Sequence, residues 1–215
     1  MINGIQLKIC GLTNVDDAMA AARSGADFLG FILYPKSPRY LPLAAYLALA
    51  AALPKGPRRV AVMVAPTAAD LAEALAAGFD FFQIHFPLTT PVVTVAGWSA
   101  QVDLARLWLA PKLPPDLDVP AEILSLAGTF LMDTFHAAGF GGSGQTGDWA
   151  KFSRHRLAYP GHTWILAGGL NTDNLSDAVK RSGSVFVDLN SGVETAPGIK
   201  DHAKLQLLAE LNCQR

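Results

Sequence analysis

The sequence predicts an α/β fold, a single compact (β/α)8 TIM barrel made by residues 1–215. Eight short β-branched or aromatic runs alternate with longer helical stretches, a pattern typical of a parallel sheet with right-handed crossovers. No second zone of composition interrupts this alternation, and the length lies at the short end for such barrels, about 200 residues upward. A flavodoxin-like or Rossmann fold would share the local pattern, so closure of the sheet is an expectation.

The expected strands are short runs rich in Val, Ile, Phe and Leu, at residues 6–10, 28–33, 59–64, 81–85, 106–109, 130–133, 163–167 and 185–189. Six helical stretches lie between or after them, at residues 15–24, 42–53, 68–77, 149–157, 172–182 and 200–211. Thr13 or Asn14 can cap the first helix, while Gly78 and Gly183 follow the third and the fifth. Six prolines fall within residues 86–126, so the region around the fourth and fifth βα units is expected to be irregular.

The charge balance favours a small-molecule partner. Lys and Arg number 17 against 18 Asp and Glu, so no basic or acidic field is present to recruit nucleic acid or a membrane surface. The longest apolar run, residues 41–53, contains Pro42 and is too short for a bilayer, which needs about 20 residues. The N-terminus shows no export signal and the two cysteines, Cys10 and Cys213, are far apart, so a reducing, cytoplasmic location is expected.

Reactive side chains occur at the expected strand ends, where the loops of a barrel build its active face. Cys10 is either a buried inert thiol or a reactive one, and its strand-end position favours the second. Asp133 follows an apolar run, so it is either a capping or ion-paired acid or one tuned for catalysis. His85 and Asp188 also fall near strand ends, although a lone histidine there is more often a hydrogen-bonded structural residue. Cys213, near the end of the last helix, is expected to be inert.

Glycines in the loops after the seventh and eighth strands are a second signal. Gly168 and Gly169 precede the helix that starts near residue 172, while Ser191 and Gly192 follow the last strand. Glycine lets backbone N–H groups approach a phosphate at a helix N-terminus, and barrels commonly hold phosphate in these two loops. Each loop taken singly is also consistent with ordinary turn chemistry.

Two further segments bear on ligand binding. The glycine-rich residues 139–147 are expected to form either a flexible loop over the barrel mouth or an ordinary surface loop. Arg39 follows Pro35 and Pro38, and a guanidinium on rigid backbone suits bidentate capture of a carboxylate, although a solvated loop arginine is the commoner case. The five histidines and two cysteines show no metal-ligand spacing, and no nucleotide fingerprint occurs. The residues alone thus predict a barrel that binds a phosphorylated, carboxylated metabolite and moves protons with a thiol and a carboxyl group.

Seven motifs cover nearly the whole chain: KICGLT at residues 8–13, GFILYPKSPRY at 30–40, QIH at 83–85, LMDTF at 131–135, GGSGQTGDW at 141–149, ILAGGLNTDN at 165–174 and DLNSGVETAPGIKD at 188–201. In their order and spacing they resemble the phosphoribosylanthranilate isomerase family. The combination of KxCGxT, GGxGxxxDW and SGVExxPGxKD is highly specific, whereas any one motif would only be suggestive. The resemblance implies a TIM barrel enzyme of tryptophan biosynthesis without cofactor or metal, a monomer or homodimer acting on a small molecule.

The resemblance also implies roles for individual residues. The family converts N-(5-phosphoribosyl)anthranilate, an aminoaldose, to the corresponding aminoketose in an Amadori rearrangement. Asp133 would be the general acid toward the furanose ring oxygen, and Cys10 the general base toward the carbon beside the imine. Arg39 would hold the anthranilate carboxylate. The other implied substrate contacts are loop residues and two supporting side chains: Gly141, Gly142, Gly168, Gly169, Ser191, Gly192, His85 and Asp188.

Two departures from the family pattern fall in the region expected to be irregular. Phe86 stands where the family usually has a loop glycine, and Leu109 aligns with a position that is commonly lysine. Both changes spare Cys10 and Asp133. Two other interpretations stay open: a related aminoaldose isomerase of histidine biosynthesis, which typically uses paired aspartates, and a catalytically silent phosphosugar-binding barrel.

Overall fold

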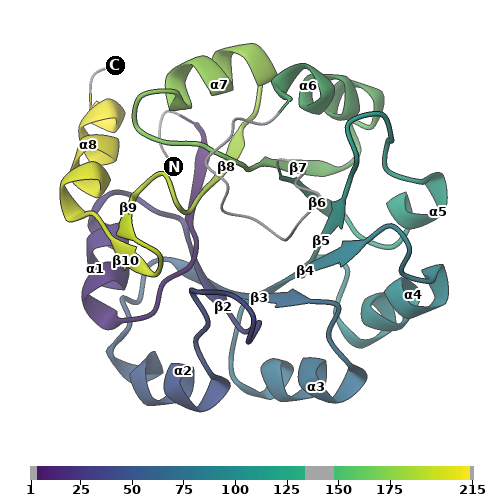
Figure 1. Ribbon diagram of the computed structural model, residues 1–215, viewed down its shortest axis with the longest axis horizontal. Helices are drawn as coiled ribbons and strands as arrows, with labels where there is room; N and C mark the ends of the chain where they lie inside the picture. The colour runs from purple at the N-terminus through teal and green to yellow at the C-terminus, as the bar shows by residue number, and fades with distance from the viewer. Residues whose placement is uncertain (1–3, 134–147, 214–215) are drawn as a thin grey trace.

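The computed structural model describes residues 4–133 and 148–213, in which eight parallel strands close into a barrel in the order of the sequence (Figure 1). The strands are β1 Gln6–Ile9, β2 Phe28–Ile32, β3 Arg58–Val64, β4 Phe81–Pro87, β5 Leu107–Lys112, β6 Thr129–Met132, β7 Thr163–Leu166 and β8 Phe186–Leu189. Each strand pairs with the next along the chain, and β8 pairs with β1. The predicted TIM barrel is therefore confirmed, because an open doubly wound sheet has no such closing pair.

The helices of the described residues lie outside the barrel and cover its strands (Figure 1). They are α1 Val15–Arg23, α2 Leu43–Leu49, α3 Ala68–Ala76, α4 Val92–Gln101, α5 Ala121–Leu124, α6 Trp149–Ala158, α7 Leu175–Ser182 and α8 His202–Cys213. A short 3-10 helix, Ala50–Ala52, continues α2, so the six predicted helices are found close to their expected boundaries. Among the described residues, no helix has the length and apolar character needed to cross a bilayer.

Local signals set where several helices begin and end. The side-chain oxygen of Asn14 accepts a hydrogen bond from the backbone N–H of Asp17 at 2.8 Å, which caps α1. Thr67 and Asp70 form a reciprocal capping box at the start of α3. Helix α7 ends at Gly183, whose φ of 66° is a left-handed conformation that favours glycine. These contacts satisfy backbone groups that helix ends leave open, so the boundaries follow from the sequence.

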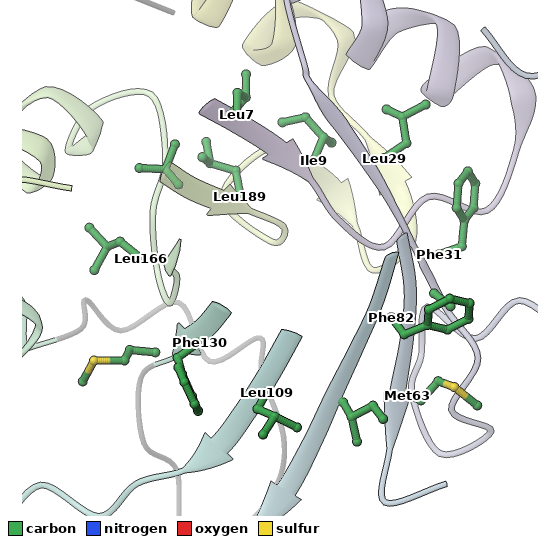
Figure 2. Close-up of a cluster of buried hydrophobic side chains, with 14 of the residues drawn as sticks. Leu7, Ile9, Leu29, Phe31, Met63, Phe82, Leu109, Phe130, Leu166 and Leu189 are labelled. Atoms are coloured by element: carbon green, nitrogen blue, oxygen red, sulfur yellow. The ribbon is translucent and has the colours of Figure 1, made fainter. Parts of the chain in front are cut away.

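Alternating strand residues build two apolar layers. Side chains that face out of the barrel belong to the larger core cluster, of which Figure 2 labels Leu7, Ile9, Leu29, Phe31, Met63, Phe82, Leu109, Phe130, Leu166 and Leu189. Side chains that face inward form a separate cluster, in which the rings of Phe28, Phe81, Trp108 and Phe186 lie 4.9–5.5 Å apart between centroids. These rings come from the first or second residue of their strands. They fill the amino end of the barrel and leave its carboxyl end for polar groups.

The region expected to be irregular is regular in its first half. Strand β4 extends to Pro87, α4 is a ten-residue helix, and the buried ring of Phe86 lies 5.5 Å from the ring of Trp98 on α4. Phe86 therefore anchors α4 against β4. Irregular backbone is concentrated after β5, where the four residues of α5 are the helical part of residues 113–128. Leu109 belongs to the outward-facing layer (Figure 2), so its side chain points away from the barrel interior.

An antiparallel hairpin, β9 Glu194–Ala196 and β10 Ile199–Lys200, follows β8 and is not predicted by the sequence pattern. It lies beside α1 in Figure 1. The backbone N–H of Lys200 donates to the Asp17 carboxylate on α1 at 2.9 Å. This bond fixes the hairpin next to the carboxyl end of β1, where the candidate site begins.

Candidate active site

A cavity of about 260 Å³ opens at the carboxyl ends of the strands, where the sequence predicts the active face. Eight predicted site residues line it: Cys10, Arg39, His85, Asp133, Gly168, Gly169, Asp188 and Ser191. Gly192 follows Ser191 but is not among the lining residues. Gly141 and Gly142, with the rest of the predicted loop 139–147, lie outside the described residues.

The closing register of the barrel brings a thiol, a cation and a carboxylate together. Lys8 of β1 pairs with Asp188 of β8, and Cys10 follows two positions later, so it faces the same interior side as Lys8. The Nζ atom of Lys8 lies 2.8 Å from Oδ2 of Asp188, and the lysine is fully buried. Gly30 on β2 leaves room for this group, because a Cβ there would lie 2.9 Å from both Cys10 Sγ and Lys8 Cε.

Burial and charge act in opposite directions on these groups. Burial raises the pKa of the Cys10 thiol, and the Lys8 ammonium offsets only part of that rise. Burial alone would lower the pKa of Lys8, but the Asp188 carboxylate and Cys10 outweigh it, so the pKa of Lys8 is raised and the lysine stays a cation. Cys10 therefore lies beside a fixed positive charge that favours its thiolate form.

Arg39 lines the cavity while one edge of its guanidinium is held by Glu194 of the hairpin. Nε donates to Glu194 Oε1 at 2.9 Å, and Nη2 donates to Oε2 at 2.6 Å. Glu194 also accepts hydrogen bonds from Lys200 Nζ at 2.9 Å and from the Gly198 N–H at 3.2 Å. Burial opposes ionisation of Glu194, yet Arg39 and Lys200 outweigh it and lower the pKa of this carboxyl group. The hairpin thereby orients the Arg39 side chain at the mouth.

His85 is positioned as a neutral hydrogen-bonding group. Its Nε2 lies 2.7 Å from Nε2 of Gln83, two residues earlier on β4. Burial, together with the charge of Lys8, lowers the pKa of His85 to about 3, so the ring is uncharged near pH 7. Within the described part of the chain, Gln83 Oε1 and Asp188 Oδ1 are buried without a hydrogen-bond partner. An unsatisfied buried acceptor is costly, so these two atoms are suited to accept hydrogen bonds from a ligand.

The glycines after β7 and β8 are required for two different reasons. Gly168 and Gly169 have left-handed backbone, with φ values of 91° and 64°. At Gly192 a Cβ would lie 2.0 Å from the carbonyl oxygen of Leu170. The side of Gly192 on which a side chain would lie is thus filled by the neighbouring loop. Asn171 and Gly192 form an isolated parallel bridge, so the two loops hold each other at the mouth.

The sequence pattern does not single out three polar side chains of this site, Lys8, Gln83 and Glu194. Lys8 and Gln83 each precede a predicted strand-end residue by two positions, so strand periodicity would have found them. Glu194 is 155 residues from Arg39, and no local signal identifies its partner. Across residues 4–133 and 148–213, no group of three or more His, Cys, Asp or Glu side chains is arranged to hold a metal ion.

The fold and the cavity together define a class of protein. A closed barrel whose mouth carries a thiol, a carboxyl group, an oriented guanidinium and two glycine loops is a (β/α)8 enzyme suited to transfer protons on an anionic small molecule. The family model for N-(5'-phosphoribosyl)anthranilate (PRA) isomerase matches residues 7–210 of this chain. The chain belongs to this family, as its motifs predict.

Relatives and solved structures agree with this membership. The N-(5'-phosphoribosyl)anthranilate isomerase of Cereibacter sphaeroides is 36% identical, over 94% of this chain and 95% of the relative. The phosphoribosyl anthranilate isomerase of Thermotoga maritima is 28% identical with a TM-score of 0.80, covering 98% of this chain and 100% of that one. Another phosphoribosyl anthranilate isomerase, solved with reduced 1-(o-carboxyphenylamino)-1-deoxyribulose 5-phosphate, is 27% identical with a TM-score of 0.75 and the same coverage.

Proposed function

We propose that this chain converts N-(5-phosphoribosyl)anthranilate to 1-(2-carboxyphenylamino)-1-deoxyribulose 5-phosphate, with Cys10 as general base and Asp133 as general acid. The chain is an aldose–ketose isomerase of tryptophan biosynthesis, because it matches the family model over residues 7–210 and its relatives carry that name. The observation that carries the residue roles is that Cys10 and Asp133 line the same cavity.

The reaction needs one proton delivered and one removed at different atoms. Asp133, at the carboxyl end of β6, donates a proton to the furanose ring oxygen; the ring C–O bond breaks and an open-chain Schiff base forms. Cys10, at the end of β1, then removes the proton from the carbon beside the imine. The resulting enolamine tautomerises to the ketone, so the proton given by Asp133 is balanced by the one that Cys10 takes up.

The two anionic ends of the substrate are proposed to bind at different parts of the mouth. Arg39 meets the anthranilate carboxylate with the part of its guanidinium that Glu194 does not occupy. His85 and Asp188 support the sugar by hydrogen bonding, and the Asp188 Oδ1 acceptor is suited to a substrate hydroxyl. The phosphate is held by backbone N–H groups in the loops after β7 and β8, at Gly168, Gly169, Ser191 and Gly192. Gly141 and Gly142 are proposed as further contacts.

The acid and base roles are tested by the loss of anthranilate-type fluorescence when purified protein is added to freshly generated substrate. Cys10→Ser and Asp133→Asn are each expected to lower turnover by about 10²–10⁴-fold or more, with the circular dichroism of the parent. Cys213→Ser, in the last helix, is the matched control and should keep parent turnover. A folded Cys10→Ser or Asp133→Asn protein with near-parent turnover would contradict these roles.

The wider setting of the enzyme is proposed on the same basis. Residues 1–215 act as one domain in the cytoplasm, on a small molecule, without cofactor, metal or nucleic acid. A monomer or homodimer is proposed, and a related structure from Thermotoga maritima is described as monomers generated from a dimeric isomerase. Sedimentation equilibrium of the purified chain distinguishes the two states.

A further inference from the structure

Lys8 places a positive charge inside the barrel, beside the proposed base. Its side chain is fully buried on β1, and its Nζ lies 2.8 Å from Asp188 Oδ2. The side chains of Lys8 and Cys10 both lie against Gly30, because a Cβ there would be 2.9 Å from Lys8 Cε and from Cys10 Sγ, and the charge of Lys8 opposes the rise in the pKa of Cys10. The lysine therefore links a carboxylate on one side to the thiol on the other.

Packing alone gives no reason for this arrangement. Replacing a buried ion pair by apolar side chains of similar volume is often neutral or stabilising. The interior below Lys8 is already apolar, with Phe28, Trp108 and Phe186 in one cluster, so an apolar residue at position 8 would extend it. A charge placed there despite the cost of desolvation is expected to serve the reactive group beside it, which is Cys10.

We propose that Lys8, oriented by Asp188, is a positioning residue that stabilises the Cys10 thiolate, the form able to remove a proton. The inference rests on the proposed role of Cys10 as general base. The thiol releases its proton to solvent, and Lys8 and the thiolate then carry opposite charges. During the reaction the proton of the substrate C–H bond passes to sulfur while Lys8 keeps its own protons. Asp188 acts in the opposite direction, because its negative charge disfavours the thiolate.

Several other charged or titratable groups surround the mouth near Cys10, namely Arg39, His85, Asp133, Glu194 and Lys200. Arg39 and Lys200 share one counter-ion, Glu194, and the charge of Lys200 also opposes the rise in the Cys10 pKa, although less than that of Lys8. His85 is neutral near pH 7. Among these groups, Lys8 is the one whose charge most strongly opposes the rise in the pKa of Cys10.

The test is a pH titration of the thiolate by its ultraviolet absorbance, in ligand-free protein carrying Cys213→Ser. Lys8→Met keeps the length of the side chain but removes its charge, so the pKa of Cys10 should rise by about one to three units. Asp188→Asn removes the negative charge and leaves Cys10 as the counter-ion of Lys8, so the pKa of Cys10 should fall. Loosened packing would move the pKa in the same direction in both variants, so opposite shifts separate the electrostatic role from a structural one.

Turnover gives a second readout. The acidic limb of the kcat/KM profile of Lys8→Met should move to higher pH, with about tenfold lower kcat/KM at pH 7 per unit of pKa change. Lys8→Arg, which keeps the charge, should return the pKa toward that of the parent, and with Asp188→Asn it decides the question if Lys8→Met does not fold. The proposal would be overturned if the pKa of Cys10 moved in the same direction in Lys8→Met and Asp188→Asn, or did not move in Asp188→Asn. It would also be overturned if the pKa of Cys10 in Lys8→Arg matched that in Lys8→Met. Because the titration uses no substrate, its outcome is independent of whether Cys10→Ser abolishes turnover.

Discussion

Replacing Glu194 by Gln is expected to loosen the proposed carboxylate clamp while leaving the acid and base in place. Glu194 accepts three hydrogen bonds from the Arg39 guanidinium and one from Lys200 Nζ, and its side chain is 4% exposed. A neutral amide at this position leaves two buried cations side by side without their counter-ion. The guanidinium thereby loses the contact that fixes its edge.

The expected loss of stability in Glu194→Gln depends on the burial of the ion pairs and on the hydrogen bonds that the glutamine amide can still accept. Breaking a buried charge pair by removing one partner typically costs about 3–5 kcal/mol. Gln keeps one carbonyl acceptor, and burial already lowers the pKa of Lys200, so this lysine can lose its proton. The expected loss in the free energy of unfolding of Glu194→Gln is therefore about 3 kcal/mol. KM should rise by about 10- to 100-fold while kcat changes little, because only substrate positioning is affected.

Urea denaturation and steady-state kinetics measure both effects, with Asp177→Asn as the control. Asp177 and Arg181 form an exposed pair at 3.4 Å on α7, so the control should lose less than about 0.5 kcal/mol. Arg39 and Lys200 hold the pKa of Glu194 below its usual 4.5. The stabilisation is thus present above about pH 4.5 and is lost as the pH falls below that value, where parent and variant converge. Equal stability of Glu194→Gln and the control at pH 7, or a fall in kcat without a rise in KM, would refute the reasoning.

Two further predictions concern the glycine loops and the half-buried His85. Gly192→Ala should lower the free energy of unfolding by about 1–3 kcal/mol, because the added Cβ meets the Leu170 carbonyl. The control Gly56→Ala has open space around its Cβ and should be nearly neutral. Equal urea midpoints of the two variants would contradict the loop contact. Because the pKa of His85 is lowered from 6.5 to about 3, its contribution to stability is complete above pH 6.5 and declines as the pH falls toward 3, with a ceiling of about 5 kcal/mol. Between pH 6.5 and 4.5 the free energy of unfolding of the parent should therefore fall faster than that of His85→Leu. Parallel plots of this free energy against pH for the two proteins would contradict the prediction.

The sequence by itself determined the βα alternation and most of the predicted residues that line the cavity. Strand patterning is a local property, so the eight strands and six of the helices could be predicted close to their observed boundaries. The same is true of Cys10, His85 and Asp133, because a residue at a strand end of a barrel faces the mouth. Prolines misled the prediction around α4, since Pro91 stands at its N-cap, where a proline does not break a helix.

Only the tertiary structure decided which groups meet. The pairing of Lys8 with Asp188 depends on the register of the closing strands β1 and β8, which lie at opposite ends of the chain. The contact of Arg39 with Glu194 depends on a hairpin that the sequence pattern does not predict. Local propensity acts over a few residues, whereas barrel closure brings together side chains more than 150 residues apart. For that physical reason the residues that line the cavity could be named from the sequence, but the contacts of Lys8 with Asp188 and of Arg39 with Glu194 could not.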